Sequence, residues 1–200
     1  MNTNKGKAVS RPKLVAGIGV NDSTTPTQET SYHDGKKVIT SCPYYKKWSL
    51  MLERCYKRDY GSYVCTAWLL FSNFKEWCIE QEKEVGDIAS LQLDKDLLSI
   101  GSLKIYSPDT CCFIPKTVNS FITTQKRSSS NLLGVYPNKK RFQTGCSNPI
   151  TGDRYHIGTF DTEEEAHEAW KSKKREISEQ MVSLGMVTQP HVKHALLNYY

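Results

Sequence analysis

The sequence predicts an α+β fold in two parts. The N-terminal part consists of helices and a ββα unit, and the C-terminal part consists of a small three-stranded sheet followed by one helix. Apolar residues recur at helical spacing in the first half of the chain. Two short β-like runs flank a turn near the middle, and three more precede a long helical pattern near the end. A wholly polar stretch separates the two parts, so we expect two small domains.

Composition indicates a soluble, cytoplasmic protein without a membrane partner. The 200 residues are 38% hydrophobic, which is enough to build a core. No run approaches the roughly 20 apolar residues of a membrane span, and the first residues lack the apolar region of a signal peptide. The seven cysteines form no Cys-x-x-Cys pair, which favours buried thiols over disulfides. A long-range zinc site made from Cys42, Cys55, Cys65 or Cys78 stays open.

The first part of the chain predicts an arm and two helices. Residues 1–40 are rich in Lys, Gly, Ser, Thr and Pro without periodicity, so they predict a flexible arm. After this arm, the spacing of apolar side chains predicts amphipathic helices over 43–57 and 70–84. Ser72 or Asn73 is expected to cap the second helix.

A β-hairpin followed by a short helix is expected next. Leu91 to Leu98 and Lys104 to Pro115 alternate or cluster as strands do, on either side of a turn at 99–102. Thr117 to Phe121 is expected to begin a short helix. These elements complete an N-terminal domain over 41–122.

The C-terminal part begins after a hinge. The run 123–131 contains no apolar residue, which is typical of a flexible linker. The domain at 132–184 starts with three strands, and Thr162 with Glu165 forms a capping box at the start of its helix. The side of this helix that we expect to pack on the sheet contains Ala166, Ala169, Trp170, Ile177 and Met181. Residues 185–200 predict a tail, because their glycine and proline break helices.

Basic residues are concentrated around the three strands. The segment from Phe113 to Phe160 contains seven basic residues and one acidic residue, so its net charge equals the +6 of the whole chain. Such a region is the electrostatic footprint of a polyanion, although surface lysines can also be merely solvated. The expected DNA contacts are Lys126, Arg127, Lys139, Lys140, Arg141, Gln143, Thr144, Arg154, Tyr155 and His156. We therefore expect double-stranded DNA as the partner, and no protein partner can be inferred.

The C-terminal segment resembles a known DNA-binding domain. The string LGVYPNKKRFQTGCSNPITGDRYHIGTFDTEEEAHEAW has the Gly-Val-Tyr opening, the Gly-Thr-Phe-Asp-Thr-Glu-Glu-Glu-Ala junction and the Ala-x-x-Ala-Trp helix of the AP2 domain. The resemblance implies that the sheet enters the major groove. It makes Arg141, Gln143, Arg154 and Tyr155 candidate base contacts. The loop 147–152 is longer than in compact AP2 domains, and a Trp often found on the sheet is replaced, so base preference does not transfer.

The preceding segment resembles a second family. WSLMLERCYKRDYGSYVCTAWLLFSNFKEWC and the later LDKDLLSIGSLKIYSPDTCCFIPKTVNSF are similar to HNH endonucleases of the phage and homing type. Such proteins often carry an AP2-like tail, and the order of parts agrees over 42–182. The resemblance therefore implies an HNH-like ββα domain followed by an AP2-like domain.

The HNH resemblance implies a metal-dependent nuclease site on the central hairpin. An HNH site holds one divalent metal, here Mg²⁺ or Mn²⁺, on the scissile phosphate and uses a histidine to deprotonate water. Asp94 stands at the metal-binding position, but Lys95 replaces the histidine and Thr110 replaces an asparagine. The candidate catalytic residues are Asp94, Lys95, Asp96, Asp109 and Asn119, with Asp94 and Asp109 as the metal ligands.

These patterns leave three functions open. The leading hypothesis is a phage-type, HNH-related protein that binds duplex DNA and cleaves it slowly if at all, because the histidine base is replaced. The first alternative is an active, magnesium-dependent nicking or homing endonuclease. The second is a non-catalytic binding protein that acts on transcription or on a host factor. A phage-encoded protein of any of these kinds is expected in the host cytoplasm.

Overall fold

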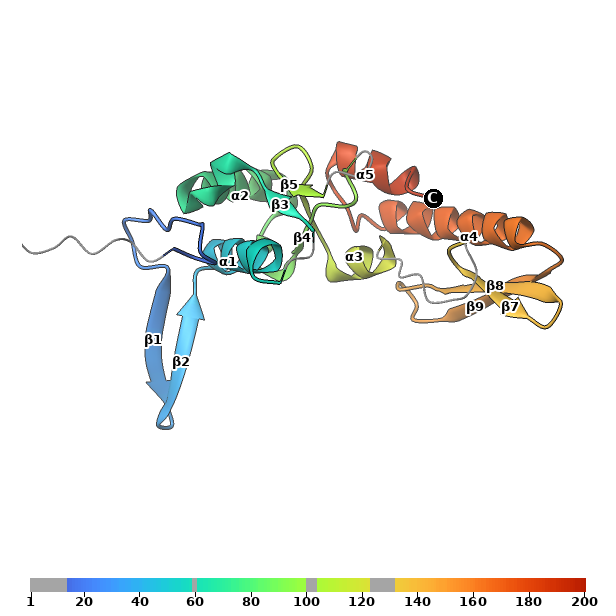
Figure 1. Ribbon diagram of the computed structural model, residues 1–200, viewed down its shortest axis with the longest axis horizontal. Helices are drawn as coiled ribbons and strands as arrows, with labels where there is room; N and C mark the ends of the chain where they lie inside the picture. Colours follow the sequence, from blue (N-terminus) through green and yellow to red (C-terminus); the bar gives the residue numbers. More distant parts are fainter. Residues whose placement is uncertain (1–13, 59–60, 100–103, 123–131) are drawn as a thin grey trace, which may run out of the picture. The chain divides into compact units, whose positions relative to one another are not determined.

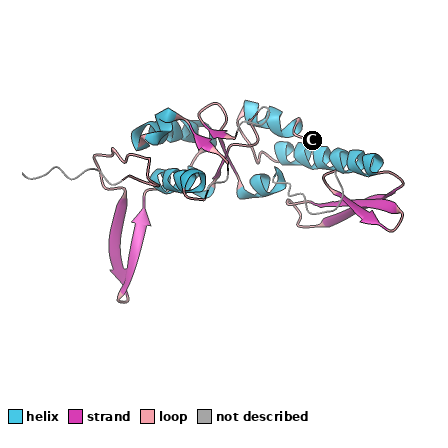
Figure 2. Cartoon of the chain, viewed as in Figure 1, coloured by secondary structure: helices cyan, strands magenta, loops and turns pink. Residues whose placement is uncertain are grey.

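The computed structural model describes residues 14–58, 61–99, 104–122 and 132–200, and it mixes helices with small sheets (Figure 1; Figure 2). The α+β class is thereby confirmed. The chain divides into two compact units. Unit 1 comprises Met1–Cys78 and Ile105–Ser107, and unit 2 comprises Ile79–Lys104 and Pro108–Tyr200. Within the described ranges, no helix combines the length and the apolar character that crossing a bilayer requires.

Unit 1 has an aromatic core. Its elements are β1 (Gln28–His33), β2 (Lys36–Ser41), α1 (Pro43–Tyr56), β3 (Tyr63–Val64), a 3-10 turn (Thr66–Leu69), the start of α2 (Phe71–Val85) and β5 (Ile105–Tyr106). Trp48, Phe71 and Phe74 are almost completely buried. The indole N–H of Trp48 donates to the carbonyl oxygen of Trp68 at 2.6 Å, which satisfies the polar atom of a buried ring. The two helices predicted for this part of the chain are confirmed.

The start of α2 is capped by a residue that is distant in the sequence. The backbone N–H and the hydroxyl of Ser72 donate to the two carboxylate oxygens of Asp22, at 2.8 and 2.5 Å. Partial burial opposes ionisation of Asp22, but the hydrogen bonds from Ser72 outweigh it and lower the pKa of this carboxyl. The expectation that Ser72 or Asn73 supplies the cap is therefore wrong.

Residues 28–41 form a regular hairpin instead of the flexible arm expected there. β1 and β2 pair antiparallel along their whole length. The two-residue turn Asp34-Gly35 has φ values of 50° and 72°, a conformation that these residue types adopt readily and that suits the twist of a hairpin. Nearly every residue of both strands is exposed, so neither strand has an apolar face to bury. The sequence therefore lacks the alternation of apolar and polar residues by which a half-buried strand is recognised.

The central hairpin of unit 2 is present but smaller than expected. This region consists of a 3-10 turn (Ile88–Ser90), β4 (Gln92–Asp94), β6 (Cys112–Ile114) and α3 (Lys116–Ile122). β4 and β6 pair antiparallel, with Asp94 opposite Cys112. Ile105 and Tyr106 were expected in the second strand, but they pair in parallel with β3 of unit 1, because residues 107–110 turn the chain before β6 begins.

The C-terminal sheet and helix have the predicted form. The strands β7 (Val135–Asn138), β8 (Arg141–Ser147) and β9 (Arg154–Phe160) are antiparallel in the order β7-β8-β9 and precede α4 (Glu163–Ser183). The predicted capping box of Thr162 and Glu165 is present at the start of α4. α4 packs on one face of the sheet (Figure 1) and buries Ala166, Trp170, Ile177 and Met181, whereas Ala169 is half-buried.

The division into units differs from the expected boundary at 123–131, a run that lies outside the described residues. β4, β6 and α3 belong to the same unit as the C-terminal sheet. The reason is a shared core, in which Val118 and Phe121 of α3 join Trp170 and Ile177 of α4. A single apolar cluster therefore ties the predicted HNH-like hairpin to the predicted AP2-like helix within unit 2.

The expected C-terminal tail contains a helix, α5 (Pro190–Leu197). A Schellman pattern of two hydrogen bonds ends α4 at Gly185, whose φ is 68°. Pro190 does not break α5 but begins it, since proline in the first helical turn lacks only an N–H that would have no helical partner. Val192 and Leu196 are buried against the core of unit 2, so the prediction of a tail is wrong.

Candidate nucleic-acid interface

One face of the β7-β8-β9 sheet is open and polar, because α4 covers the other. Along β8, Thr144 and Cys146 are buried, whereas Arg141 is exposed and Gln143 is half-exposed. Successive side chains of a strand point to opposite faces, so the residues that alternate with the buried ones form the open face. We call this surface the outward sheet face. It presents Tyr136, Asn138, Arg141, Gln143, Arg154 and His156, with Lys139 and Lys140 in the β7–β8 turn.

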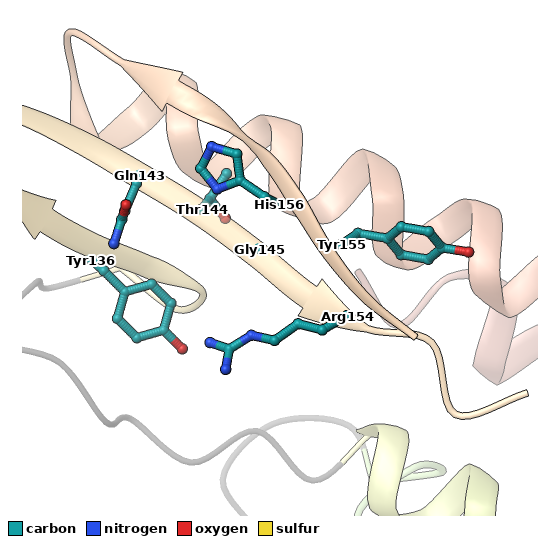
Figure 3. Close-up of a pocket in the computed structure, with 7 residues that line it drawn as sticks. All are labelled: Tyr136, Gln143, Thr144, Gly145, Arg154, Tyr155 and His156. Atoms are coloured by element: carbon teal, nitrogen blue, oxygen red, sulfur yellow. The ribbon is translucent and has the colours of Figure 1, made fainter. Parts of the chain in front are cut away.

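The outward sheet face contains a shallow hollow of about 230 Å³ (Figure 3). Its lining residues are Tyr136, Gln143, Thr144, Gly145, Arg154, Tyr155 and His156. The guanidinium group of Arg154 extends toward the hydroxyl of Tyr136 in Figure 3. The hollow therefore brings a planar cationic fork close to a phenol, and the amide of Gln143 and the imidazole of His156 add further hydrogen-bonding groups.

A β-bulge sets the direction of the side chains at the start of β9. The pairing register shifts between Thr144 and Gly145, so that Gly145 lies opposite His156. A Cβ atom at Gly145 would lie 2.5 Å from the carbonyl oxygen of Tyr155, which leaves no room for a larger residue. The bulge thereby places Arg154 and His156 on the outward sheet face, where both are exposed.

The side chains of two expected DNA contacts, Thr144 and Tyr155, point away from the outward sheet face. Thr144 is only 1% exposed, and its hydroxyl donates to the carbonyl oxygen of Gly134 at 2.7 Å. The ring of Tyr155 packs toward α4, where the Nζ atom of Lys173 lies 4.5 Å from the ring centroid. Strand alternation therefore directs both side chains toward the core, which leaves Thr144 buried and Tyr155 half-buried, and their contacts with DNA stay predictions.

The other strand and turn residues that were expected to contact DNA are available on the surface. Lys139 and Lys140 are exposed in the β7–β8 turn. The Nε atom of Arg141 lies 2.7 Å from Oδ1 of Asp161, in an ion pair that is open to solvent. Tyr136 is an addition that the sequence argument missed, and its signal was the alternation with the buried Val135.

The carboxylates of the central hairpin are placed by a tight turn after β4. Asp94 is 7% exposed, and its Oδ1 accepts hydrogen bonds from the backbone N–H groups of Asp96 and Leu97 at 3.1 and 2.8 Å. Burial raises the pKa of the Asp94 carboxyl. The Nζ atom of Lys95 lies 2.5 Å from Oδ1 of Asp96. The turn thus brings Asp94, Lys95 and Asp96 together, and the ammonium group is held by the exposed carboxylate.

The other two candidate catalytic residues lie on separate elements. Asp109 is exposed in the turn before β6. The charged neighbours that affect the pKa of Asp94 are Asp96 and Lys95, and Asp109 is not among them. Asn119 is half-buried in α3. Among the residues that the structure describes, no group of three or more His, Cys, Asp or Glu side chains is arranged to hold a metal ion, and all seven cysteines are free thiols. A metal site formed by Asp94 and Asp109 therefore stays a prediction.

Lys126 and Arg127 fall outside the described residues, so their contacts with DNA also stay predictions. Comparison of the chain with family models, curated proteins and solved structures finds no significant match. The AP2 and HNH resemblances accordingly remain expectations drawn from sequence motifs. The geometry and charge of the outward sheet face are the main support for a function.

Proposed function

We propose that this protein binds duplex DNA through the outward sheet face. The observation that carries the proposal is the set of side chains on this face. Arg141, Arg154 and the two turn lysines supply positive charge beside the hydrogen-bonding groups of Gln143 and His156, while α4 covers the opposite face. Basic groups gain affinity by releasing the counterions of phosphates, and Arg and Gln side chains can each form paired hydrogen bonds with a base edge.

The distribution of these groups along the sheet also suits a duplex. The turn lysines lie at one end of β8, and Arg154 pairs with Ser147 at the other end, which is about 20 Å away at the rise of a β-strand. Gln143 and His156 lie between these two ends. The B-DNA major groove is about 12 Å wide and admits a β-ribbon. Charges at both ends of the strand therefore suit phosphates, with the hydrogen-bonding groups of Gln143 and His156 between them facing the bases.

Cleavage of the bound DNA has weaker support than binding. Oδ1 of Asp94 is engaged by the turn that follows β4, and Lys95 stands where the HNH pattern has a histidine base. A missing general base lowers the rate of hydrolysis by orders of magnitude. Binding with slow or absent cleavage is therefore the function that we propose.

Binding is tested with the full-length protein and a labelled short duplex, with anisotropy measured over a range of salt concentrations. We expect a log-log salt slope of roughly −3 to −6. Arg154→Ala should weaken binding roughly tenfold, whereas Lys83→Ala on α2 should leave it unchanged. Absence of binding at low salt, or equal binding by the Arg154→Ala and Lys83→Ala variants, would contradict the proposal. Supercoiled plasmid with Mg²⁺ or Mn²⁺, and without metal, reports any cleavage.

A further inference from the structure

A second basic segment lies in unit 1. Between Lys36 and Arg58 the sequence contains seven basic residues and one acidic residue. The net charge of the chain conceals this segment, because the stretch from Glu76 to Asp96 contains seven acidic and two basic residues. A polyanion responds to the charge within a Debye length, about 8 Å at physiological salt, and so to the local excess rather than to the total.

The basic residues of α1 and of its C-terminal cap share one side of the helix. At 3.6 residues per turn, the four of them fall within an arc of about 100°, and a fifth follows directly after the cap. We call this surface the α1 basic face. It consists of Lys46, Lys47, Arg54, Lys57 and Arg58, and all of these side chains are exposed except that of Lys47, which is half-buried.

The opposite side of α1 already packs in the core of unit 1. Trp48 and Leu52 are 0% exposed, and Met51 is 1% exposed. A basic amphipathic helix binds a membrane by inserting its apolar side into the lipid, and that side is unavailable here. The α1 basic face therefore meets a partner through charge, which suits the phosphates of a nucleic acid better than a lipid surface.

Few acidic groups neutralise this face. Glu53 is the only acidic residue of α1, and it lies 3.4 Å from Nζ of Lys57 in a pair that is open to solvent. Exposed pairs of this kind contribute little free energy, so a phosphate can replace the carboxylate. Within the described residues, Lys46 and Arg54 form no ion pair.

The length of the α1 basic face also fits a nucleic-acid backbone. From Lys46 to Lys57 the helix rises about 16 Å. Phosphates of one DNA strand recur about every 3.4 Å along the duplex axis, so the face extends over the rise of about five phosphates. We infer that the α1 basic face is a second DNA-binding surface, which contacts the phosphate backbone and adds affinity for any base sequence.

The inference is tested in the full-length protein by removing two charges from this face. The variant combines Lys46→Gln with Arg54→Gln, and its matched control combines Lys75→Gln with Lys83→Gln on α2. Removal of one phosphate contact should reduce the salt slope by about 0.9, so the α1 variant should show a slope about 2 units shallower and bind all duplexes roughly tenfold more weakly. The control should keep the wild-type slope. A variant of the α1 basic face that binds as the control does would overturn the inference.

Chemical acetylation of lysines in the wild-type protein gives a second readout that does not depend on the stability of a variant. A duplex should protect Lys46 and Lys57 but not Lys75 and Lys83. Equal modification of Lys46 and Lys57 with and without duplex would overturn the inference, as would protection by phosphatidylserine vesicles and not by DNA. If Arg154→Ala has no effect while the α1 variant loses affinity, the proposed role of the sheet fails and this inference stands.

Discussion

The Nε atom of Arg141 lies 2.7 Å from Oδ1 of Asp161, at the junction between β9 and α4. A cation on the outward sheet face is therefore already paired in the free protein. The two side chains are 52% and 78% exposed, so the pair contributes little to stability. If DNA binds as we propose, the larger effect of this pair is on binding, because the carboxylate of Asp161 would compete with DNA for Arg141 and would repel nearby phosphates.

We therefore expect Asp161→Asn to tighten binding to duplex DNA by about threefold to tenfold at low salt, with the gain shrinking as salt screens the charges. Anisotropy titrations with a labelled duplex measure this effect. Glu164→Gln is a suitable control, because it removes an exposed acidic charge from the same helix start without a contact to Arg141. If both variants gain equally, the effect reflects net charge and not the release of Arg141.

Two glycines allow the close packing of the sheet on α4 to be measured separately from backbone strain. Gly134 and Gly152 have φ values of 76° and 81°, so an alanine is equally strained at either position. A Cβ atom at Gly134 would lie 2.4 Å from the ring of Trp170, whereas a Cβ atom at Gly152 would meet nothing within 4 Å. We expect Gly134→Ala to lower the free energy of unfolding by about 1–3 kcal/mol more than Gly152→Ala in urea titrations. Equal losses would show that Trp170 moves aside without cost.

Lys174 is a buried cation in the core of unit 2. Its Nζ atom donates to the carbonyl oxygen of Phe121 at 2.6 Å and lies over the rings of Phe121 and Tyr200. Burial lowers the pKa of Lys174 to about 8. Between this value and the ordinary lysine pKa of 10.5, the unfolded chain binds a proton that the folded chain has released. The stability contributed by this residue should therefore rise with pH across that window.

The measurement compares the wild type with Lys174→Met, which keeps the volume and removes the titration. From about pH 7.5 to about pH 9.5, the free energy of unfolding of the wild type should increase relative to that of the variant by about 1 kcal/mol or more. Urea titrations at each pH give the difference. A difference that stays constant, or that moves in favour of Lys174→Met as the pH rises, would contradict the assignment of a lowered pKa to this residue.

We predict that Asp94 stabilises the fold as a hydrogen-bond acceptor and not through its negative charge. Asp94→Asn keeps an oxygen for the N–H groups of Asp96 and Leu97, whereas Asp94→Ala leaves both groups without that acceptor. We expect Asp94→Ala to cost about 1–3 kcal/mol of unfolding free energy at neutral pH, and Asp94→Asn to cost little or nothing. Because burial raises the pKa of Asp94, the folded wild type takes up a proton before the unfolded chain does as the pH falls.

The wild type should therefore gain stability relative to Asp94→Asn on acidification, from the raised pKa of Asp94 down to its ordinary value of 3.8. Urea titrations at several acidic pH values measure this gain. Equal destabilisation by Asn and by Ala at neutral pH would show that the negative charge itself is required at this position.

Elements whose signals lie within a few residues were predictable from the sequence. The capping box joins Thr162 to Glu165 three residues later, and the start of α4 follows from that pair alone. The apolar residues of α1 recur at the helical period, so both the helix and its buried side were readable. The concentration of basic residues near the three strands was equally visible, because a count of charges needs no fold.

The candidate site was predictable only as a set of residues and not as a surface. Arg154 and Tyr155 are adjacent in the sequence, and both residue types can contact DNA. Arg154 nevertheless faces solvent, whereas Tyr155 packs toward α4. Their directions depend on the bulge at Gly145, which is a property of the pairing between β8 and β9. Tyr136 was missed because its alternation with Val135 shows only that the two side chains face opposite sides of the sheet, and the packing of α4 decides which side meets solvent.

The sequence by itself determined the class of fold, the principal helices and strands, and the residues that carry positive charge. Only the tertiary structure decided which side of each element meets solvent, that Asp22 caps α2 from 50 residues away, and that Pro190 begins a packed helix. The physical reason is the range of the interactions involved. Capping and periodicity act between near neighbours, whereas burial and strand register depend on contacts between distant segments, whose free energy no short stretch of sequence contains.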